Sequence, residues 1–373
     1  MTTYNISIKM NATFKILYFY DYHHFDTGSP KAMVSVIDSL DLNKFSPLFL
    51  ASGEGDLVNE MTKRNITIIP GGAESISFKN PFKSLFNIYA QITMLREHKI
   101  DILHINEFGW NTDLVFSAWL CNIPVVLHIH NPIEIHSNNI NRFFAKKVLV
   151  CSETLRRSIT NIKYITHKCE VLYNQVDIDW ASSGNPIQKQ LGIDEKDVVI
   201  GTIAQICHRK GSDIFVEVAK RCLTTHDNLT FLLIGPDGSG EVDFANKLRE
   251  ISSQAEYKGR IKFIGSRSDI PNLLASMDIF MLTTRSEPFG IVIIEAMAAG
   301  LPVIASKTGG IPEIITNNTI GRTVNKIETD AFYDELQNIL NMPDIRNSIG
   351  KKGKSSILGR FDTKTISVTI NKI

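Results

Sequence analysis

The 373-residue sequence lacks several features that would assign it to a class at once. No apolar run approaches the ~20 residues that a membrane-spanning helix needs. The 40 Lys and Arg residues nearly balance the 39 Asp and Glu residues, which argues against a nucleic-acid binder held by bulk positive charge. The N-terminal stretch MTTYNISIKM does not follow the pattern of a secretory signal peptide, so we expect none.

Cysteine is also scarce, with five residues and no C-x-x-C spacing. This usage favours reduced core cysteines over a disulfide framework or a zinc site, and predicts a cytoplasmic protein. Hydrophobic residues make up 43% of the chain, enough to exclude a disordered protein. At roughly 100–200 residues per domain, the length predicts about two domains.

Short apolar runs alternate with helical stretches along the chain, a pattern typical of parallel sheets covered on both faces. The break ASSGNP at 181–186 separates two such series and predicts a domain boundary near residue 185. The strands expected in the first series are 15–20, 46–52, 65–70, 101–105, 124–130, 146–152 and 169–174. Those expected in the second are 198–204, 230–235, 261–265, 278–284 and 302–306. The predicted fold class is α/β, with two doubly wound domains.

Glycine is concentrated in the second half, with 17 of the 23 glycines after residue 180. Glycine-rich turns after strands let backbone N–H groups approach a ligand closely. The second half is therefore the predicted phosphate-binding half, although extra turns alone would also explain the excess.

Two carboxylates lie in the segment that carries most of the chemistry, residues 278–315. Glu287 is in a loop after a predicted strand, and Glu295 is in a helix expected from Ile291 to Gly300. The N-terminus of such a helix suits a phosphate, and carboxylates suit pairs of sugar hydroxyls. Ligands of open α/β sheets bind beyond the carboxyl ends of the strands, where both the Glu287 loop and the start of this helix are expected.

The segment resembles the E-x7-E signature of retaining, nucleotide-sugar-dependent glycosyltransferases of the GT-B fold, family 4 (glycosyl transferases group 1). The similarity extends to RKGSDIFVEVA (209–219), FLLIGPDG (231–238), YNQVD (173–177), IPVVLHIHN (123–131) and FDTGSPKA (25–32). It implies two Rossmann-like domains facing across a cleft. Residues 1–184 would bind the acceptor, residues 185–351 the nucleotide sugar, and 352–373 would cross back to the first domain.

The resemblance also implies roles for individual residues. Lys210 matches the lysine that holds the donor diphosphate, Glu287 the acid that contacts the transferred sugar, and Glu295 the residue that binds the ribose. The catalytic residues so predicted are Glu287, His130 and Lys210. The predicted donor-binding residues are Gln205, Arg209, Lys210, Arg267, Phe289, Gly290, Glu295 and Gly28.

One position departs from the family pattern. Gln205 stands where an arginine usually supplies a second phosphate cation, so the diphosphate would depend on Lys210, Arg209 or Arg285. The predicted reaction moves a hexose, with retention, from a nucleoside diphosphate sugar to a hydroxyl of a glycan or lipid-linked glycan in cell-surface polysaccharide biosynthesis. We expect no metal, no cofactor and no nucleic acid. A non-catalytic partner subunit and a GT-B-like nucleotide-sugar epimerase or phosphorylase remain alternatives.

Other patterns compete for a functional role. Asp177-x-Asp179 has the form of a metal–sugar motif, but it lies in the loop before the linker, in the YNQVD stretch that the resemblance already covers. His128-x-His130 has the form of a metal-ligand pair, but the remaining ligands of such a site are not evident. Segment 142–168 holds seven Lys or Arg residues and one acid. It is either a solvated face, which we favour, or a patch that places a cytoplasmic enzyme at the inner face of the membrane.

Overall fold

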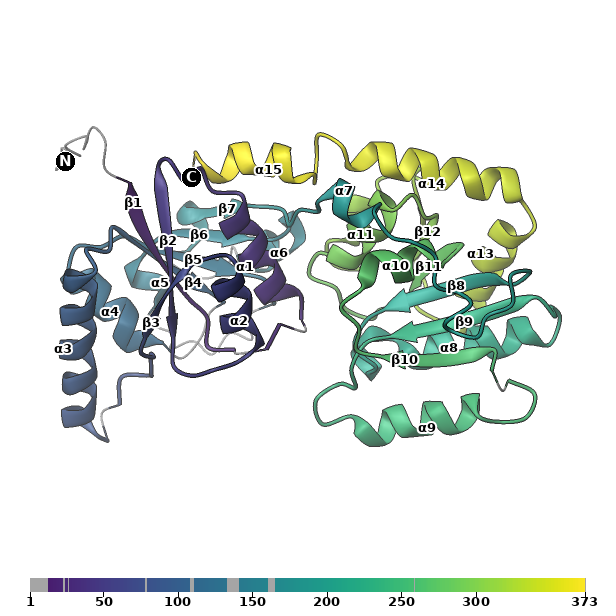
Figure 1. The fold of residues 1–373 in the computed structure, drawn as a ribbon, viewed down its shortest axis with the longest axis horizontal. Helices are drawn as coiled ribbons and strands as arrows, with labels where there is room; N and C mark the ends of the chain where they lie inside the picture. The colour runs from purple at the N-terminus through teal and green to yellow at the C-terminus, as the bar shows by residue number, and fades with distance from the viewer. Residues whose placement is uncertain are drawn as a thin grey trace. The chain divides into compact units, whose positions relative to one another are not determined.

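The structure is a computed structural model, drawn in Figure 1. It describes residues 13–22, 24–25, 27–77, 79–107, 111–132, 141–159, 165–257 and 259–372. The chain forms two compact units. The first holds residues up to Val150, Arg156–Val171 and the last four residues, and the second holds Cys151–Leu155 and Leu172–Thr369.

The first unit is built on a seven-stranded parallel sheet of order β3-β2-β1-β4-β5-β6-β7. Its strands are β1 (Phe14–Phe19), β2 (Phe45–Ala51), β3 (Thr67–Pro70), β4 (Ile102–Asn106), β5 (Val125–Ile129), β6 (Ala145–Val150) and β7 (Cys169–Val171). The helices α1 (Gly28–Asp38), α2 (Asp56–Lys63), α3 (Pro81–Glu97), α4 (Thr112–Leu120), α5 (Asn141–Phe144) and α6 (Glu153–Ile159) connect them. The central strands β1, β4 and β5 are mostly buried, because helices cover both faces of such a sheet.

One face of the first sheet carries buried polar rings among the aliphatic side chains. In the strand register Tyr18 pairs with His104, and Asn106 pairs with His128. Paired residues, and residues two apart on a strand, point to the same face, so these side chains share it. The His104 ring lies 4.7 Å from the Tyr18 ring and 5.5 Å from the His128 ring, measured between centroids.

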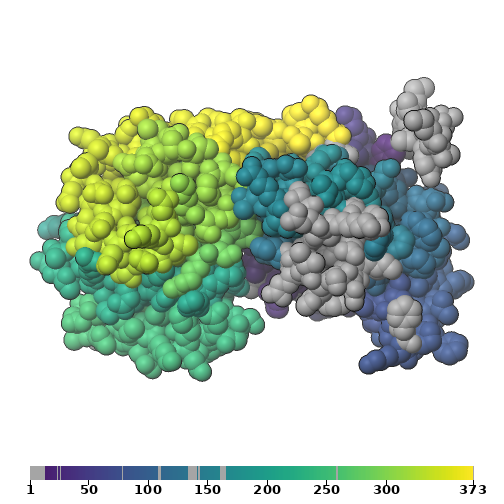
Figure 2. Space-filling model, turned by 180° about the vertical axis from the view of Figure 1, so that it is seen from behind, coloured from purple at the N-terminus to yellow at the C-terminus, as the bar shows by residue number. Residues whose placement is uncertain are grey.

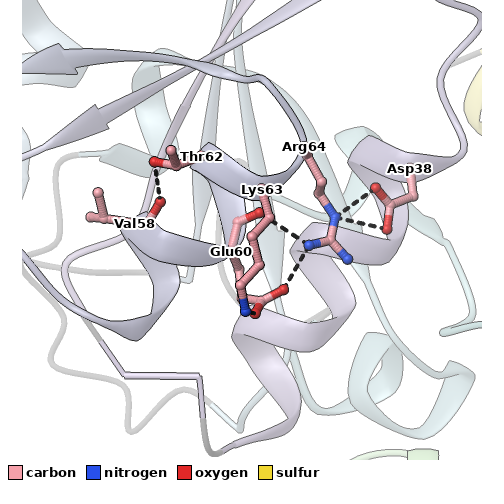
Figure 3. A network of polar contacts seen from close by, with 6 residues as sticks. All are labelled: Asp38, Val58, Glu60, Thr62, Lys63 and Arg64. Carbon is pink, nitrogen blue, oxygen red and sulfur yellow. Dashed lines mark hydrogen bonds and ion pairs between the residues drawn. The ribbon is translucent and has the colours of Figure 1, made fainter.

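A surface network joins the ends of α1 and α2 (Figure 3). Arg64 Nε lies 2.8 Å from Asp38 Oδ1, and Arg64 Nη1 lies 2.7 Å from Glu60 Oε2. Lys63 Nζ contacts the other oxygen of Glu60 at 2.6 Å. The hydrogen bonds from Lys63 and Arg64 lower the pKa of Glu60. Arg64 thus fixes the C-terminus of α2 against α1.

The second unit is built on a six-stranded parallel sheet of order β10-β9-β8-β11-β12-β13. Its strands are β8 (Val198–Ile203), β9 (Leu229–Ile234), β10 (Ile261–Gly265), β11 (Ile279–Leu282), β12 (Val303–Ser306) and β13 (Arg322–Val324). Its main helices are α8 (Ser212–Leu223), α9 (Val242–Ser252), α10 (Ile270–Ala275), α11 (Ile291–Ala298), α13 (Thr329–Leu340), α14 (Pro343–Ile357) and α15 (Thr363–Ile370). The short helices α7 (Ile178–Ala181) and α12 (Ile311–Ile314) and the turn η2 (His208–Lys210) complete it.

The alternation of strands and helices predicted from the sequence is confirmed in both units, since every predicted strand overlaps an observed one. The strand β13 was not predicted, because its three residues include a single buried side chain. The fold class, two Rossmann-like α/β domains, is likewise confirmed.

The end of the chain returns to the first unit. Asn371 Oδ1 accepts the Asp41 backbone N–H at 2.8 Å, and its Nδ2 donates to the Ser39 carbonyl oxygen at 3.0 Å. In the view from behind, α13 and α14 lie at the surface of the second unit (Figure 2). Within the described residues, no helix is long and apolar enough to cross a bilayer.

Candidate functional site

The centre of the candidate site is an ion pair between two residues far apart in the sequence. Lys210 Nζ lies 2.6 Å from Glu287 Oε2, and the two side chains are 15% and 10% exposed. Lys210 ends the turn after β8, and Glu287 lies in the loop after β11. These two strands are neighbours in the sheet, so both groups stand at the edge formed by the strands' C-terminal ends.

Backbone contacts hold the Lys210 turn against the end of β11. The Arg285 N–H donates to the Arg209 carbonyl oxygen at 2.9 Å, and Thr283 Oγ1 donates to the Gly211 carbonyl oxygen at 2.7 Å. Gly211 has a φ of +68°, and a Cβ there would overlap the Thr283 carbonyl oxygen. Only glycine allows this approach, so the Lys210 ammonium is placed by the backbone rather than by a flexible loop.

A second glycine turn holds the Glu287 loop. The Gly310 N–H donates to the Glu287 carbonyl oxygen at 3.1 Å. Gly309 has a φ of +54°, and a Cβ there would overlap the same oxygen. The Gly309–Gly310 turn therefore packs against the backbone of Glu287 and holds this loop in place.

Arg285 is already bound within the protein. Its two terminal nitrogens contact Asp213 Oδ1 and Oδ2 at 2.8 and 2.7 Å, and one also donates to the His208 carbonyl oxygen at 2.6 Å. The pair raises the pKa of Arg285. Because Arg285 is bound to Asp213, the cations that could compensate for Gln205 are Lys210 and Arg209. Arg209 Nη2 lies 3.4 Å from Gln205 Oε1.

Three of the remaining predicted residues of the second unit lie in or next to α11, and one lies apart. Gly290 is its N-cap residue, and Glu295 is buried in its second turn. The Phe289 side chain is buried against Tyr173 and Phe361, with ring centroids 5.8 and 5.5 Å away. Arg267 lies apart, in a bidentate pair with Asp269 at 2.7 and 2.6 Å.

Gly28 and His130 lie in the first unit, at the corresponding edge of its own sheet. Gly28 begins α1. His130 Nε2 lies 3.0 Å from Asn106 Oδ1, while Asn106 Nδ2 donates to the Ser29 carbonyl oxygen at 3.3 Å. An amide oxygen only accepts, so Nε2 carries the ring proton and Nδ1 is the acceptor nitrogen. Burial, with a contribution from nearby His104, lowers the pKa of His130 to about 3, and the ring is neutral at pH 7.

Glu107 is a residue of this edge that the sequence did not single out. Its backbone has a φ of +75°, a strained value for a side chain of this size. Its carboxylate accepts hydrogen bonds from Ser29 Oγ, from Asn131 Nδ2 at 2.7 Å and from the His130 N–H at 3.4 Å. Burial raises the pKa of Glu107. The only signal in the sequence was its position directly after β4.

Glu313 is a second residue that was missed. Its carboxylate accepts the backbone N–H groups of Glu153 and Thr154, both at 2.8 Å, and the Tyr173 hydroxyl at 3.0 Å. It therefore anchors residues 151–155 within the second unit. Its contacts are structural, and hydrogen bonds from segments so distant in the chain could not be read from the sequence.

The competing motifs have structural explanations. Asp177 Oδ1 accepts the N–H groups of Asp179 and Trp180 at 2.9 and 3.1 Å and so caps α7. His128 is buried, and burial lowers its pKa well below the usual value. Among the described residues, no group of three or more His, Cys, Asp or Glu side chains could hold a metal ion.

The basic segment 142–168 is only partly available to a partner. Lys147 Nζ pairs with Glu170 at 2.9 Å, and Lys168 Nζ donates to the Phe143 carbonyl oxygen at 3.4 Å. Lys163 and the side chain of Arg142 lie outside the described residues.

Comparison with known proteins identifies the family. Residues 185–356 match Glycosyl transferases group 1, and residues 47–180 match Glycosyltransferase Family 4. The chain is a family 4 glycosyltransferase of the GT-B fold. Among solved structures, that of Anabaena Alr3699/HepE in complex with UDP-glucose superimposes on this glycosyltransferase with a TM-score of 0.82, at 20% identity, over 96% of this chain and 98% of that one.

Two curated relatives illustrate the range of similar sequences. N-acetyl-alpha-D-glucosaminyl L-malate synthase of Bacillus anthracis is 25% identical over 61% of this glycosyltransferase and 60% of its own length. The UDP-Gal:alpha-D-GlcNAc-diphosphoundecaprenol alpha-1,3-galactosyltransferase of Escherichia coli is 24% identical over 79% of each chain.

Proposed function

We propose that this glycosyltransferase moves a hexose from a nucleoside diphosphate sugar to a hydroxyl of a glycan or lipid-linked glycan, with retention at the anomeric carbon, in polysaccharide or glycolipid biosynthesis. The observation that carries the proposal is the Lys210–Glu287 pair, which puts a cation and a carboxylate side by side at a glycine-lined sheet edge. The complex of HepE with UDP-glucose and the lipid-diphosphate acceptor in the name of the E. coli relative support it.

In this proposal the two partners of the ion pair meet different parts of the donor. Without donor, Glu287 neutralises the Lys210 ammonium. When the donor binds, its diphosphate takes over Lys210, assisted by Arg209 and the N-terminus of α11, and Glu287 turns to the hydroxyls of the sugar. The cations stabilise the charge that grows on the leaving diphosphate, which is the task a metal performs in other transferases.

The other predicted residues take positions around this centre. Glu295 would accept hydrogen bonds from the ribose hydroxyls, and the Phe289 and Gly290 backbone would approach the sugar and phosphate. Gln205 would donate a hydrogen bond to the diphosphate, Arg267 would flank the nucleotide, and Gly28 would close under it. Neutral His130, whose Nε2–H is committed to Asn106, would lie near the reacting sugar.

A thermal-shift screen against a panel of nucleoside diphosphate sugars tests donor binding. A ligand at about 100 times its dissociation constant stabilises the folded state by about 2.7 kcal/mol, so the correct donor should raise Tm by several degrees. If no member of the panel changes Tm, the proposal is wrong and a non-catalytic partner subunit is favoured.

Product analysis then separates transfer from its rivals. The selected donor is incubated with a lipid-diphosphate-linked sugar or a small hydroxy acid as acceptor, with and without EDTA. A new glycoside that forms equally well in EDTA supports the proposal. An epimerised donor or a sugar phosphate without glycoside would support an epimerase or phosphorylase instead, and loss of activity in EDTA would contradict metal independence.

We also propose that the protein is cytoplasmic and works at the inner face of the membrane, where a lipid-linked acceptor would be presented. The basic segment 142–168 is one possible membrane-contact surface. Its lysines Lys147 and Lys168 already make contacts within the protein, so they are less available to lipid headgroups.

A further inference from the structure

Helix α3 of the first unit presents a row of large apolar side chains to the solvent. Phe82, Leu85, Phe86 and Tyr89 are 84%, 63%, 71% and 71% exposed. Their spacing of three, four and seven residues places them along one stripe of the helix. Monomeric proteins rarely expose a contiguous patch of this kind unless something covers it.

The opposite side of α3 is fixed to the unit, so the exposed stripe is not a sign of a loosely placed helix. Gln91 Nε2 donates to the Gly72 carbonyl oxygen at 3.2 Å, and Gln91 Oε1 accepts from Ser117 Oγ of α4 at 3.0 Å. Leu95 is fully buried on the same side. Figure 1 shows α3 outside α4, farther from the sheet.

The charges around the stripe are mainly positive. Segment 79–99 contains Lys79, Lys83, Arg96 and Lys99 but only one acid, Glu97. Lys83 Nζ also lies 2.8 Å from Glu74 in an exposed ion pair. Within the part of the chain that the structure describes, the other three bases form no ion pair. A stripe of Phe, Leu and Tyr flanked by basic residues matches the interfacial zone of an anionic bilayer, where apolar side chains insert and cations meet the headgroups.

We propose that α3 docks on the surface of an anionic lipid bilayer, with Phe82, Leu85, Phe86 and Tyr89 inserted among the acyl chains. The inference rests on the proposed membrane contact of this glycosyltransferase and assigns that contact to a surface, but it does not depend on the transfer reaction. A second copy of the chain is the other partner that could cover this apolar stripe. A net positive surface opposes pairing with its own copy and favours anionic lipid.

Flotation with lipid vesicles tests the proposal. The purified full chain is mixed with vesicles of phosphatidylglycerol and phosphatidylcholine in equal parts, or of phosphatidylcholine alone. We expect binding to the anionic vesicles that weakens as salt is raised. The double variant Phe82→Ser/Phe86→Ser should lower the partition coefficient at least tenfold, by roughly the burial of two aromatic side chains.

A matched control removes apolar surface elsewhere. Leu42→Ser/Val242→Ser deletes two exposed apolar side chains outside α3 and should bind vesicles like the wild type. Equal binding by all three proteins would overturn the proposal, as would an absence of binding to anionic vesicles. A lipid-free dimer that the α3 variant converts to monomer, without vesicle binding, would instead assign the stripe to a second copy.

The donor screen keeps the two proposals distinguishable. The α3 variant should show the same thermal stabilisation by nucleoside diphosphate sugars as the wild type, since α3 contributes no predicted site residue. A donor-induced rise in Tm without vesicle binding would contradict the docking inference alone. Vesicle binding without a donor-induced rise in Tm would contradict the proposed function alone.

Discussion

The two units use the same sheet architecture but present different groups at the edge formed by the C-terminal ends of their strands. The first unit places buried or half-buried polar groups there, among them the neutral His130 ring, the Asn106 amide and the Glu107 carboxylate with its hydrogen-bond donors. The second places a cation–carboxylate pair between two glycine turns. A parallel sheet therefore fixes where such groups gather, while the loops decide which groups they are.

The largest expected effect comes from removing the charge of the second unit. Lys210→Ala should lower the rate of glycosyl transfer by roughly 10²–10³, because the leaving diphosphate loses its principal cation. Transfer is measured by product formation at saturating acceptor. The control Lys220→Ala removes a lysine of α8 that pairs with Glu217 on the surface and should leave the rate unchanged. Equal rates for both variants would remove the phosphate role of Lys210.

The glycine turns of the second unit provide the next test. Gly309→Ala should lower the free energy of unfolding by about 3 kcal/mol, because the new Cβ overlaps the Glu287 carbonyl oxygen. The matched control Gly240→Ala also has a positive φ but has no heavy atom within 4 Å of the new Cβ. Urea unfolding compares the two, and equal losses would mean that backbone strain alone, not the support of Glu287, explains the effect.

Acid should destabilise the first unit more than the second. Burial lowers the pKa of His104 and His130 to about 3 and that of His128 well below 6.5, so the unfolded chain binds more protons than the folded one. The contribution of these rings to the free energy of unfolding is present above their unfolded-state pKa of about 6.5, and it is lost as pH falls toward their folded-state pKa values. Between pH 7 and pH 6 the loss should be about 2 kcal/mol for the three rings together.

Hydrogen exchange, corrected for intrinsic rates, measures this loss separately in each unit. Amides of β4 and β5 should lose protection, while those of β8 and β9 serve as the control, since no histidine among the described residues of the second unit is buried. His104→Phe keeps an aromatic ring against Tyr18 and should remove about a third of the pH dependence. Parallel losses in both units would contradict the assignment.

The smallest effect is expected at Glu107. Glu107→Gln replaces one acceptor oxygen with an amide NH2 group that faces N–H and O–H donors, so the contacts to Ser29, Asn131 and His130 weaken. If these contacts position the edge of the first unit, kcat/KM should fall about tenfold with the donor-induced Tm shift unchanged. Glu74→Gln, at an exposed ion pair, is the control. A lost Tm shift with an unchanged rate would contradict a positioning role in transfer.

The sequence predicted the elements of the fold far better than the contacts of the site. Hydrophobic periodicity is a local property, so the strands from β1 to β12 could be found from short runs, and only the three-residue β13 escaped. Helix α3 was harder, because it carries apolar residues on both sides, and periodicity does not say which side is buried.

Patterns within the sequence are enough to predict that two strand–helix series form two parallel sheets, and that Glu287, Glu295 and the glycine turns follow strands of the second. Three properties emerge only in the folded chain: Lys210 contacts Glu287, Arg285 is bound to Asp213, and His130 is neutral. Secondary structure follows from residues close in the chain. Ion pairs and pKa values instead depend on distance and burial in space. The Lys210–Glu287 and Arg285–Asp213 pairs each join groups more than seventy residues apart in the chain.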